Sequence, residues 1–320
     1  MIEDLFSKPV TKKGNVLLIS ENSEAENQQQ TNEAFSRKWV SFSKEEEQEQ
    51  AKFSTFQKQW YLQLYGFEDE VSLADYLRSK PIILDAGCGL GYKASWLARL
   101  APESTVIGMD YSDAAYVAAN KYSDLKNLFF VKGDISNTGL KSGVIDYVNC
   151  DQVIHHTQDP AKTYSELVRV LAPKGDLAVY VYAKKALPRE LVDDYFREAS
   201  KSISHEEMVE FSEQLTELGK RLSELSTEID VPEIPLLDIK GGKMDVQRFI
   251  YWNFLKCFWN EDLGRPSSVS TNYDWYAPSN AYRYTSQEFL KMASDNNMEK
   301  IFLHSEEACH SGRFRKMNQR

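Results

Sequence analysis

The chain has 320 residues, of which 42% are hydrophobic, and its formal net charge is −10. This length fits one large α/β domain with an insertion or two smaller domains, and no apolar run reaches the roughly 18 residues of a membrane span. The acidic balance disfavours a nucleic-acid partner, which is normally bound through a basic face, and favours a small or cationic one.

The N-terminus and the cysteines indicate a cytoplasmic protein. Residues 1–14 lack the basic head and apolar core of a secretory signal. The cysteines are far apart and form no C-x-x-C pair, so we expect free thiols in a reducing compartment and no structural metal. They are Cys88, Cys150, Cys257 and Cys309.

The first 79 residues are predicted to precede the main domain. Residues 16–19 form a short β-like run, and the polar run 21–30 predicts a flexible segment over residues 1–30. Aromatic residues at helical spacing then predict a helical N-terminal cover over residues 31–79. They are Phe35 and Trp39, followed by Phe53, Phe56 and Trp60. These aromatics either dock on the main domain or close a site.

From residue 80 the pattern changes to strands that alternate with helices. Strands are predicted at 82–85, 105–110, 128–132, 145–151 and 175–182, with helices at 92–100, 113–122 and 160–171. This alternation predicts an α/β fold with a Rossmann-like, doubly wound and mostly parallel sheet. Its core is residues 80–184. A helix at 286–293 and closing strands at 298–303 and 312–316 make residues 286–320 its completion, giving seven strands.

A large helical insertion, residues 185–285, follows the fifth strand. Its apolar residues between Met208 and Ile229 alternate spacings of three and four, which is a heptad seam. The seam predicts either a helix packed on a neighbour within the chain or a homodimer through residues 208–229. A second apolar helix is predicted around residues 249–259.

The stretch "LDAGCGLG" carries the clearest chemical signal. Gly87, Gly89 and Gly91 stand at alternate positions directly after the first strand, and Asp85 precedes them. A dinucleotide site has the pattern G-x-G-x-x-G, but Tyr92 occupies the third glycine position here. The tighter spacing suits a ligand that lies flat against the backbone.

This stretch resembles motif I of the class I S-adenosylmethionine-dependent methyltransferases, and further landmarks follow in order through "VIGMD", "VKGDI" and "IDYVNCDQVIHH". The resemblance implies S-adenosylmethionine as cofactor, with Asp110 on the ribose hydroxyls and Asp134 and Ile135 at the adenine. Alternatively, Asp110 is a helix cap and Asp134 an ordinary turn acid. The implied cofactor residues are Asp85, Gly87, Cys88, Gly89, Gly91, Asp110, Tyr111, Asp134, Ile135, Asp151 and Gln152.

Methyl transfer needs a general base only when the acceptor must lose a proton. His155 and His156 follow the fourth strand and are the catalytic candidates, with a purely structural role as the alternative. Metal binding by this pair is disfavoured, because adjacent side chains diverge.

An aromatic segment near the end of the insertion predicts the acceptor pocket. Aromatic rings with an acid suit a cation, whereas Arg283 favours a carboxylate; a zwitterion satisfies both. The candidates are Trp39, Tyr273, Asp274, Trp275, Tyr276, Tyr282, Arg283 and Tyr284.

The resemblance also implies that the insertion, residues 185–285, forms a substrate-binding part or lid. It therefore implies a methyltransferase of specialised metabolism that acts at N or O of a small molecule, such as an amine or an amino-acid-like intermediate. The alternatives are an RNA-modifying methyltransferase, which the net charge opposes, and a non-catalytic cofactor-binding protein with an interaction helix.

Overall fold

The computed structural model describes residues 2–19, 26–42 and 47–318, apart from the side chains of 40–42, 47–50, 52 and 53. It contains two compact units. Unit 1 consists of Met1–Ala183 together with Tyr282–Arg320, and unit 2 is Lys184–Ala281. Each unit has its own secondary structure and interior.

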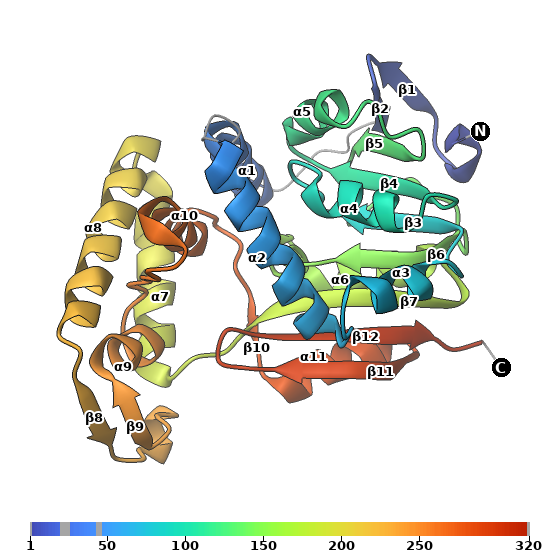
Figure 1. Ribbon diagram of the computed structural model, residues 1–320. Coiled ribbons are helices and arrows are strands. Elements are labelled where there is room, and N and C mark those ends of the chain that lie inside the picture. Colours follow the sequence, from blue (N-terminus) through green and yellow to red (C-terminus); the bar gives the residue numbers. More distant parts are fainter. Residues whose placement is uncertain (1, 20–25, 43–46, 319–320) are drawn as a thin grey trace. The chain divides into compact units, whose positions relative to one another are not determined.

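A central sheet of ten strands organises the described part of unit 1 (Figure 1). Its neighbours run β1-β2-β5-β4-β3-β6-β7-β12-β11, and β10 pairs separately with β7. The pairings from β2 to β7 are parallel, whereas β1, β12 and β11 pair antiparallel to their neighbours. The predicted mostly parallel α/β sheet is confirmed. The strands are β1 (Val10–Lys13), β2 (Val16–Ile19), β3 (Ile82–Ala86), β4 (Thr105–Asp110), β5 (Leu128–Lys132), β6 (Ile145–Cys150), β7 (Leu171–Ala183), β10 (Arg283–Tyr284), β11 (Met298–Ser305) and β12 (Cys309–Lys316).

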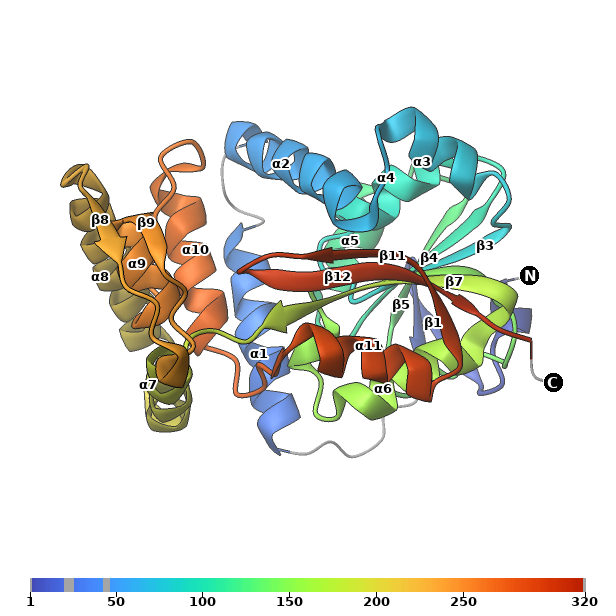
Figure 2. The ribbon, with the colours of Figure 1, turned by 90° about the horizontal axis from the view of Figure 1, so that it is seen from below.

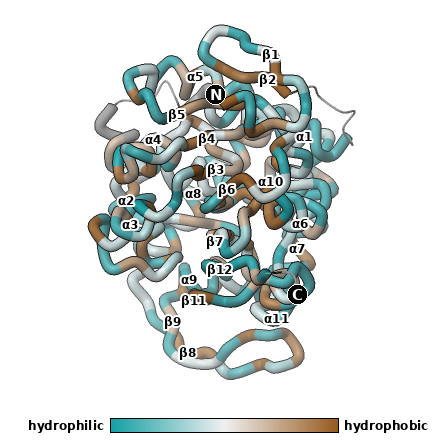
Figure 3. Tube along the Cα trace, turned by 90° about the vertical axis from the view of Figure 1, so that its right-hand side faces the viewer, coloured by the Kyte–Doolittle hydropathy of each residue, from teal (hydrophilic) through white to brown (hydrophobic). Residues whose placement is uncertain are grey.

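Helices cover both faces of this sheet, which explains why its central strands are apolar on both sides. Ile83 and Leu84, consecutive in β3, are both fully buried against opposite faces. Figure 2 shows the helices above and below the sheet, and Figure 3 shows hydrophobic segments along β2 and β4. One face carries α2 (Glu47–Tyr65), α3 (Glu70–Leu77), α4 (Tyr92–Leu100) and α5 (Ala114–Lys121), and the other carries α6 (Pro160–Val170) and α11 (Ser286–Asp295).

The N-terminal segment differs from the prediction of a flexible stretch over residues 1–30. The hairpin of β1 and β2 extends the sheet beyond seven strands, because β2 pairs with β5 and buries Val16 and Leu17. Phe6 bridges Leu140, and Lys8 Nζ donates to Asn137 Oδ1 at 2.7 Å. Residues 20–25, within the predicted polar linker, lie outside the described residues, and α1 (Glu26–Phe42) follows.

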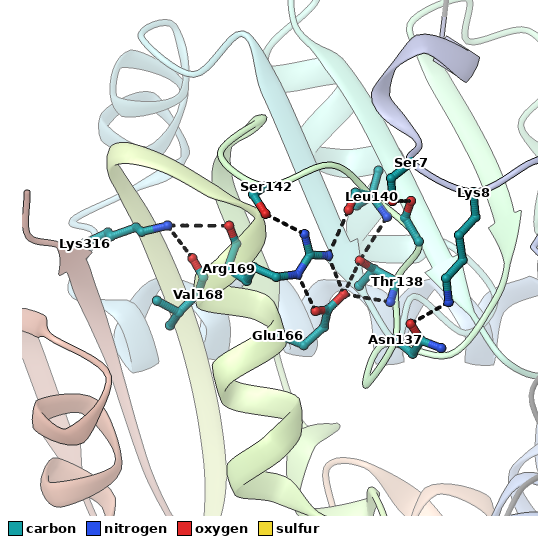
Figure 4. Close-up of polar contacts among 11 residues, drawn as sticks. Ser7, Lys8, Asn137, Thr138, Leu140, Ser142, Glu166, Val168, Arg169 and Lys316 are labelled. Carbon is teal, nitrogen blue, oxygen red and sulfur yellow. Dashed lines mark hydrogen bonds and ion pairs between the residues drawn. The ribbon is translucent and has the colours of Figure 1, made fainter. Parts of the chain in front are cut away.

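The loop that receives this N-terminal segment is fastened to α6 by a polar network (Figure 4). Glu166 Oε1 accepts hydrogen bonds from the backbone and hydroxyl of Thr138, at 2.9 and 2.6 Å. Arg169 binds the same carboxylate and donates to the Leu140 carbonyl at 2.8 Å. The N-terminal segment is therefore joined to the sheet by the pairing of β2 with β5 and by the contacts of Phe6 and Lys8 with this loop.

Asp176, near the start of β7, binds three elements at the end of the sheet opposite to the glycine turn. Its buried carboxylate accepts from Lys80 Nζ at 2.5 Å, from the Tyr76 hydroxyl at 2.6 Å and from Arg315 Nε at 2.7 Å. These partners hold the pKa of Asp176 below its usual value in spite of burial. The cluster fixes α3 and β12 against β7.

Unit 2 is mostly helical, with one small antiparallel hairpin. Its predicted heptad segment forms α8, which begins with a capping box between Ser204 and Glu207. This helix packs on α10, and Gly219 approaches so closely that a Cβ there would overlap the Cys257 carbonyl. The elements are α7 (Leu187–Ala199), α8 (His205–Glu224), β8 (Glu228–Val231), β9 (Gly242–Asp245), α9 (Val246–Asn253) and α10 (Gly264–Tyr276).

Three details of unit 2 depart from the sequence prediction. The heptad helix ends at Glu224, and Ile229, the last seam residue, lies in β8. The apolar helix predicted at 249–259 is α9, which ends at Asn253. Helices α7 and α10 had no predicted counterpart. Leu218 and Leu225 remain exposed on α8 or at its end, and dimer formation through this helix stays a prediction.

Candidate functional site

The turn between β3 and α4 has a backbone that only glycine adopts readily. Gly87, Gly89 and Gly91 have φ angles of +82°, +51° and +76°, in the left-handed region that costs other residues free energy. A Cβ on Gly87 would also overlap the Val153 side chain, and one on Gly91 would lie 2.9 Å from the Phe130 ring. The three glycines are needed both for the bend and for close packing around it.

This turn lies where parallel α/β sheets usually bind ligands. The chain order of the strands reverses between β3 and β6, and the carboxyl ends of both strands meet beside the turn. The N-terminus of α4 begins at Gly91, which has no side-chain cap. In the first turn of this helix, the backbone N–H of Ala94 interacts with the Asp85 carboxylate.

Asp110, the last residue of β4, binds the glycine turn directly. Its Oδ2 accepts from the backbone N–H of Gly89 at 2.7 Å, and its Oδ1 accepts from the backbone and hydroxyl of Ser112 at 2.8 and 2.6 Å. Burial raises the pKa of Asp110 and these hydrogen bonds oppose the rise. An ionised carboxylate has about four acceptor positions. One position is therefore left, and a second opens when the Ser112 hydroxyl rotates.

Asp85, next to last in β3, contributes a buried carboxylate oxygen that no described residue satisfies. Its Oδ1 accepts from Asn149 Nδ2 at 2.6 Å, whereas Oδ2 has no hydrogen-bond partner within the described structure. Burial, partly opposed by the Asn149 hydrogen bond and the charge of Lys93, raises the pKa of Asp85 to about 6. A buried oxygen of this kind fits a ligand that brings a cation or a donor.

Asp151 is occupied by other residues of the chain. Its Oδ1 accepts from the Tyr65 hydroxyl at 2.7 Å, and its Oδ2 forms an ion pair with Lys93 and accepts from Gln152 Nε2. Gln152 also donates to Gln57 and has a φ of +63°. These contacts join α2 and α4 to the end of β6. Tyr65 and Lys93 were not predicted as site residues, although Lys93 lies in the first turn after the glycines.

The remaining predicted cofactor residues lie around β4 and β5. Asp134 accepts from the backbone and the hydroxyl of Ser136, both at 2.7 Å, as a turn acid does. Ile135 is buried in the sheet core, and the buried Cys88 thiol contacts the Gly89 carbonyl at 3.8 Å. Tyr111, which directly follows Asp110, lies partly buried at the start of the loop.

The two candidate catalytic histidines lie in a short 3₁₀ turn, Ile154–His156, and are surrounded by aromatic rings. The His155 ring centroid lies 3.9 Å from that of Tyr182, and the His156 centroid lies 4.8 Å from that of Phe35. His155 is fully buried, and its Nδ1 is 3.4 Å from the Tyr180 carbonyl. His156 is 6% exposed. Of the two, His156 is the one with solvent contact.

Trp39 of α1 lies against the glycine turn. A Cβ built on Gly89 would lie 3.0 Å from Trp39 Cε2. The indole packs with Leu90, Tyr92 and Ala114, on both sides of the turn. The N-terminal helix and the glycine backbone therefore form one surface.

The predicted acceptor residues belong to both compact units. Tyr282, Arg283 and Tyr284 belong to unit 1, where the Tyr282 N–H donates to the His155 carbonyl at 2.9 Å. Tyr273, Asp274, Trp275 and Tyr276 belong to α10 of unit 2. A shared acceptor pocket stays a prediction, and each set is described within its own unit.

The α10 aromatics contribute to the interior of unit 2. Trp275 Nε1 and the Tyr276 hydroxyl both donate to the buried Asp193 carboxylate at 2.7 Å, and Arg189 Nε binds it at 2.7 Å. Lys256 lies 4.8 Å from the Trp275 ring centroid. Burial, and then the charge of Arg189, lowers the pKa of Lys256 to about 7. The polar ends of Trp275 and Tyr276 are thereby bound to Asp193, which accounts for their burial.

Comparison with known proteins identifies the part of the chain that carries the glycine turn. Residues 84–179, from within β3 to within β7, match the family described as "Methyltransferase domain". The match covers less than a third of the chain, and we call these residues the methyltransferase domain.

The methyltransferase domain is similar to enzymes that methylate small molecules and carriers. It is 35% identical over 104 residues to malonyl-[acyl-carrier protein] O-methyltransferase of Legionella pneumophila, covering 32% of this chain and 37% of that protein. It is 36% identical over 101 residues to trans-aconitate 2-methyltransferase of Deinococcus radiodurans, covering 32% and 38%. The chain thus spans less than half of the length of the curated relatives it matches.

A solved structure also aligns with this chain. The S-adenosylmethionine-dependent methyltransferase from Aquifex aeolicus aligns with 79% of this chain and 91% of its own, at 15% identity and a TM-score of 0.41.

Among the helices described here, none is long and apolar enough to cross a membrane.

Proposed function

We propose that this protein transfers a methyl group from S-adenosylmethionine to N or O of a small-molecule acceptor, such as an amine or an amino-acid-like intermediate. The observation that carries the proposal is the glycine turn, whose backbone is bound to Asp110 at 2.7 Å beside the unsatisfied oxygen of Asp85. The small-molecule relatives of the domain and the net charge of −10 support a small acceptor over RNA.

The described residues fit this cofactor. We assign Asp110 to the two ribose hydroxyls, because its carboxylate retains one acceptor position and the Ser112 hydroxyl that occupies another is free to rotate. We assign the Asp85 oxygen to the cationic methionine end of the cofactor. Bound S-adenosylmethionine supplies an electrophilic methyl group on a positively charged sulfur.

Asp134 and Ile135 complete the proposed donor site at the adenine. Both oxygens of Asp134 accept from Ser136 in the structure, and each oxygen can accept a further hydrogen bond from an amino group. The apolar Ile135 side chain suits the face of a base. Trp39, packed on Gly89, would exclude water from the same turn.

For the acceptor, the chain needs mainly to position the attacking atom, since orientation alone can supply roughly 7–11 kcal/mol. We assign this positioning to His156, with Tyr282, Arg283 and Tyr284 from unit 1 as further candidates, and His155 as its buried support. A His156→Asn variant tests a base role through the pH profile of turnover. Loss of the limb that titrates near neutral pH supports proton transfer, whereas an unchanged profile with a raised KM supports positioning.

The decisive experiment incubates the full chain with S-adenosylmethionine labelled in its methyl group. The acceptors are panels of amines, amino acids and hydroxyl compounds, with bulk tRNA in parallel. Label transferred to a small molecule, with formation of the demethylated donor, supports the proposal. Transfer to tRNA alone identifies an RNA-modifying enzyme instead. Tight binding of the donor without transfer to any acceptor identifies a non-catalytic cofactor-binding protein.

A further inference from the structure

The turn between β11 and β12 brings together three side chains that commonly bind metal ions. His304, Glu306 and Cys309 each offer one ligand atom, and these atoms lie within 4.8 Å of one another. His304 Nε2 is 3.3 Å from Glu306 Oε2, and Cys309 Sγ is 3.6 Å from Glu306 Oε1. The cluster contains one nitrogen, one oxygen and one sulfur ligand.

The strand register explains why these side chains meet. His304 pairs with Ser311 across the hairpin, and the Glu306 N–H donates to the Cys309 carbonyl at 3.0 Å to close the turn. Side chains two residues apart on a strand share a face. His304 and Glu306 therefore lie on the same face as Cys309 and Ser311. Ser311 Oγ donates to the Leu64 carbonyl, so this face packs against α2.

The spacing agrees with tetrahedral coordination. Zinc binds nitrogen and oxygen at about 2.1 Å and thiolate sulfur at about 2.3 Å. At a tetrahedral angle, these bond lengths place a nitrogen about 3.4 Å from an oxygen, and a sulfur about 3.6 Å from an oxygen. The Glu306 carboxylate lies 3.3 Å from the nitrogen through one oxygen and 3.6 Å from the sulfur through the other, which is close to these edges, and the nitrogen and the sulfur lie within 4.8 Å of each other. We propose that His304, Glu306 and Cys309 form a zinc site whose fourth coordination position is open.

The burial of the ligands also suits a metal. Cys309 is fully buried, whereas the His304 and Glu306 side chains are 18% and 30% exposed, so solvent reaches the cluster from one side. A divalent ion binds cysteine as the thiolate, and the thiol proton is released to solvent on binding.

The site lies at the edge of the sheet that also carries the histidine pair. Cys309 is the register partner of Tyr182, whose ring is the one 3.9 Å from His155. Zinc sites with three protein ligands usually keep a fourth position for water or substrate. On the proposed function, the ion is therefore placed where an acceptor oxygen can be bound and made more acidic.

Zinc chloride titrated into the metal-stripped full chain by calorimetry tests the proposal. We expect one ion per chain and a rise in melting temperature on binding. Cys309→Ser and His304→Ala should each weaken binding by more than about 100-fold, because even an indirect partner of a metal ligand contributes 10- to 100-fold. The matched controls are Glu307→Gln and His310→Ala. His310 neighbours the cluster in sequence but lies on the opposite face, where it stacks on Phe289.

Cobalt provides a readout that does not depend on activity. Co²⁺ in the same site should show a thiolate charge-transfer band and the visible bands of a tetrahedral ion, and Cys309→Ser should lose the thiolate band. Zinc affinity that is equal in wild type and both ligand variants overturns the proposal, as does a wild type that binds no zinc. If Cys309→Ser fails to fold, a Glu306→Gln, His304→Ala double variant decides in its place.

Discussion

Replacement of Asp110 by asparagine tests the donor site most directly. The substitution keeps the size of the side chain and removes its charge. Hydrogen bonds to a charged group contribute about 1.5–3 kcal/mol each, and the ribose offers two hydroxyl donors. One of them must displace the Ser112 hydroxyl, which already binds Oδ1 at 2.6 Å. The exchange leaves a net loss of about 1.5–3 kcal/mol, so we expect donor affinity to fall by about 10- to 150-fold.

The assay is calorimetric titration with S-adenosylhomocysteine, which binds without turnover. Asp113→Asn is the matched control, because Asp113 lies three residues away, is mainly exposed and pairs with Lys132. Its affinity should stay within about twofold of wild type, since exposed ion pairs contribute little. A urea unfolding curve for each variant confirms that the protein titrated is folded.

Ligands that lack the 2′- or 3′-hydroxyl complete a double-mutant cycle with Asp110→Asn. Each missing hydroxyl should weaken binding to wild type and change binding to the variant little. Equal losses in both proteins would refute the ribose assignment, as would an Asp110→Asn variant that binds the donor as tightly as wild type.

Three further predictions concern buried charges. Asp85→Asn should raise the unfolding free energy by about 2–3 kcal/mol above pH 6, because the folded pKa of about 6 exceeds the ordinary 3.8 and ionisation opposes folding there. Urea unfolding at pH 8 and pH 4 checks this, and a gain that persists at pH 4 contradicts it. Lys256→Met should stabilise the protein by a few kcal/mol near pH 7. The pKa of Lys256 is about 7 in the folded protein and 10.5 in the unfolded chain, so between these pH values folding removes a proton from the lysine, and the variant avoids this cost. The gain should fade towards pH 10 in the same assay. Asp176→Asn should destabilise by about 3–5 kcal/mol at pH 7, since Lys80 is left buried without its partner. That deficit should start to shrink in melting curves below about pH 3.8, where the carboxyl of the unfolded chain takes up a proton, and it should be lost as the pH falls through the lower pKa of the folded protein. A deficit independent of pH would count against the ion-pair explanation.

The parallel core was predictable because its signals are local. Strands such as β3 and β4 are short apolar runs buried on both faces, and each is followed by turn residues. The glycine turn was predictable for a similar reason, since three alternate glycines indicate a backbone with positive φ. Asp110 was selected as a candidate for the same kind of reason, because it is an acid at the end of a predicted strand.

Contacts between distant residues were not predictable from these local signals. The strand β1 is mostly exposed and polar, and only its hairpin partner and β5 make it part of the sheet. Asp151 is predicted at the cofactor from its position after β6. Its partner Tyr65 lies 86 residues earlier in the chain, and its other partner, Lys93, lies in α4. The sequence around an acid that follows a strand does not show whether other residues of the chain or a ligand will bind its carboxylate.

The aromatic residues of α10 illustrate a second limit. Trp275 and Tyr276 have the composition of a pocket wall, yet the residue that binds their polar ends, Asp193, lies more than 80 positions away. The spacing H-x-E-x-x-C of residues 304–309 similarly gains its meaning only from the hairpin register. The cysteine spacing considered alone contained no metal signal.

The way unit 2 is attached has a consequence for how such a protein can change. The chain leaves the sheet after Ala183 and re-enters it at Arg283, which pairs with Tyr182 on the neighbouring strand. Adjacent strands are about 4.8 Å apart, so a short glycine bridge is long enough to join the two ends. Residues 184–281 are therefore an exchangeable cassette. A lineage can lengthen, replace or delete it while the sheet of unit 1 and its glycine turn are inherited intact.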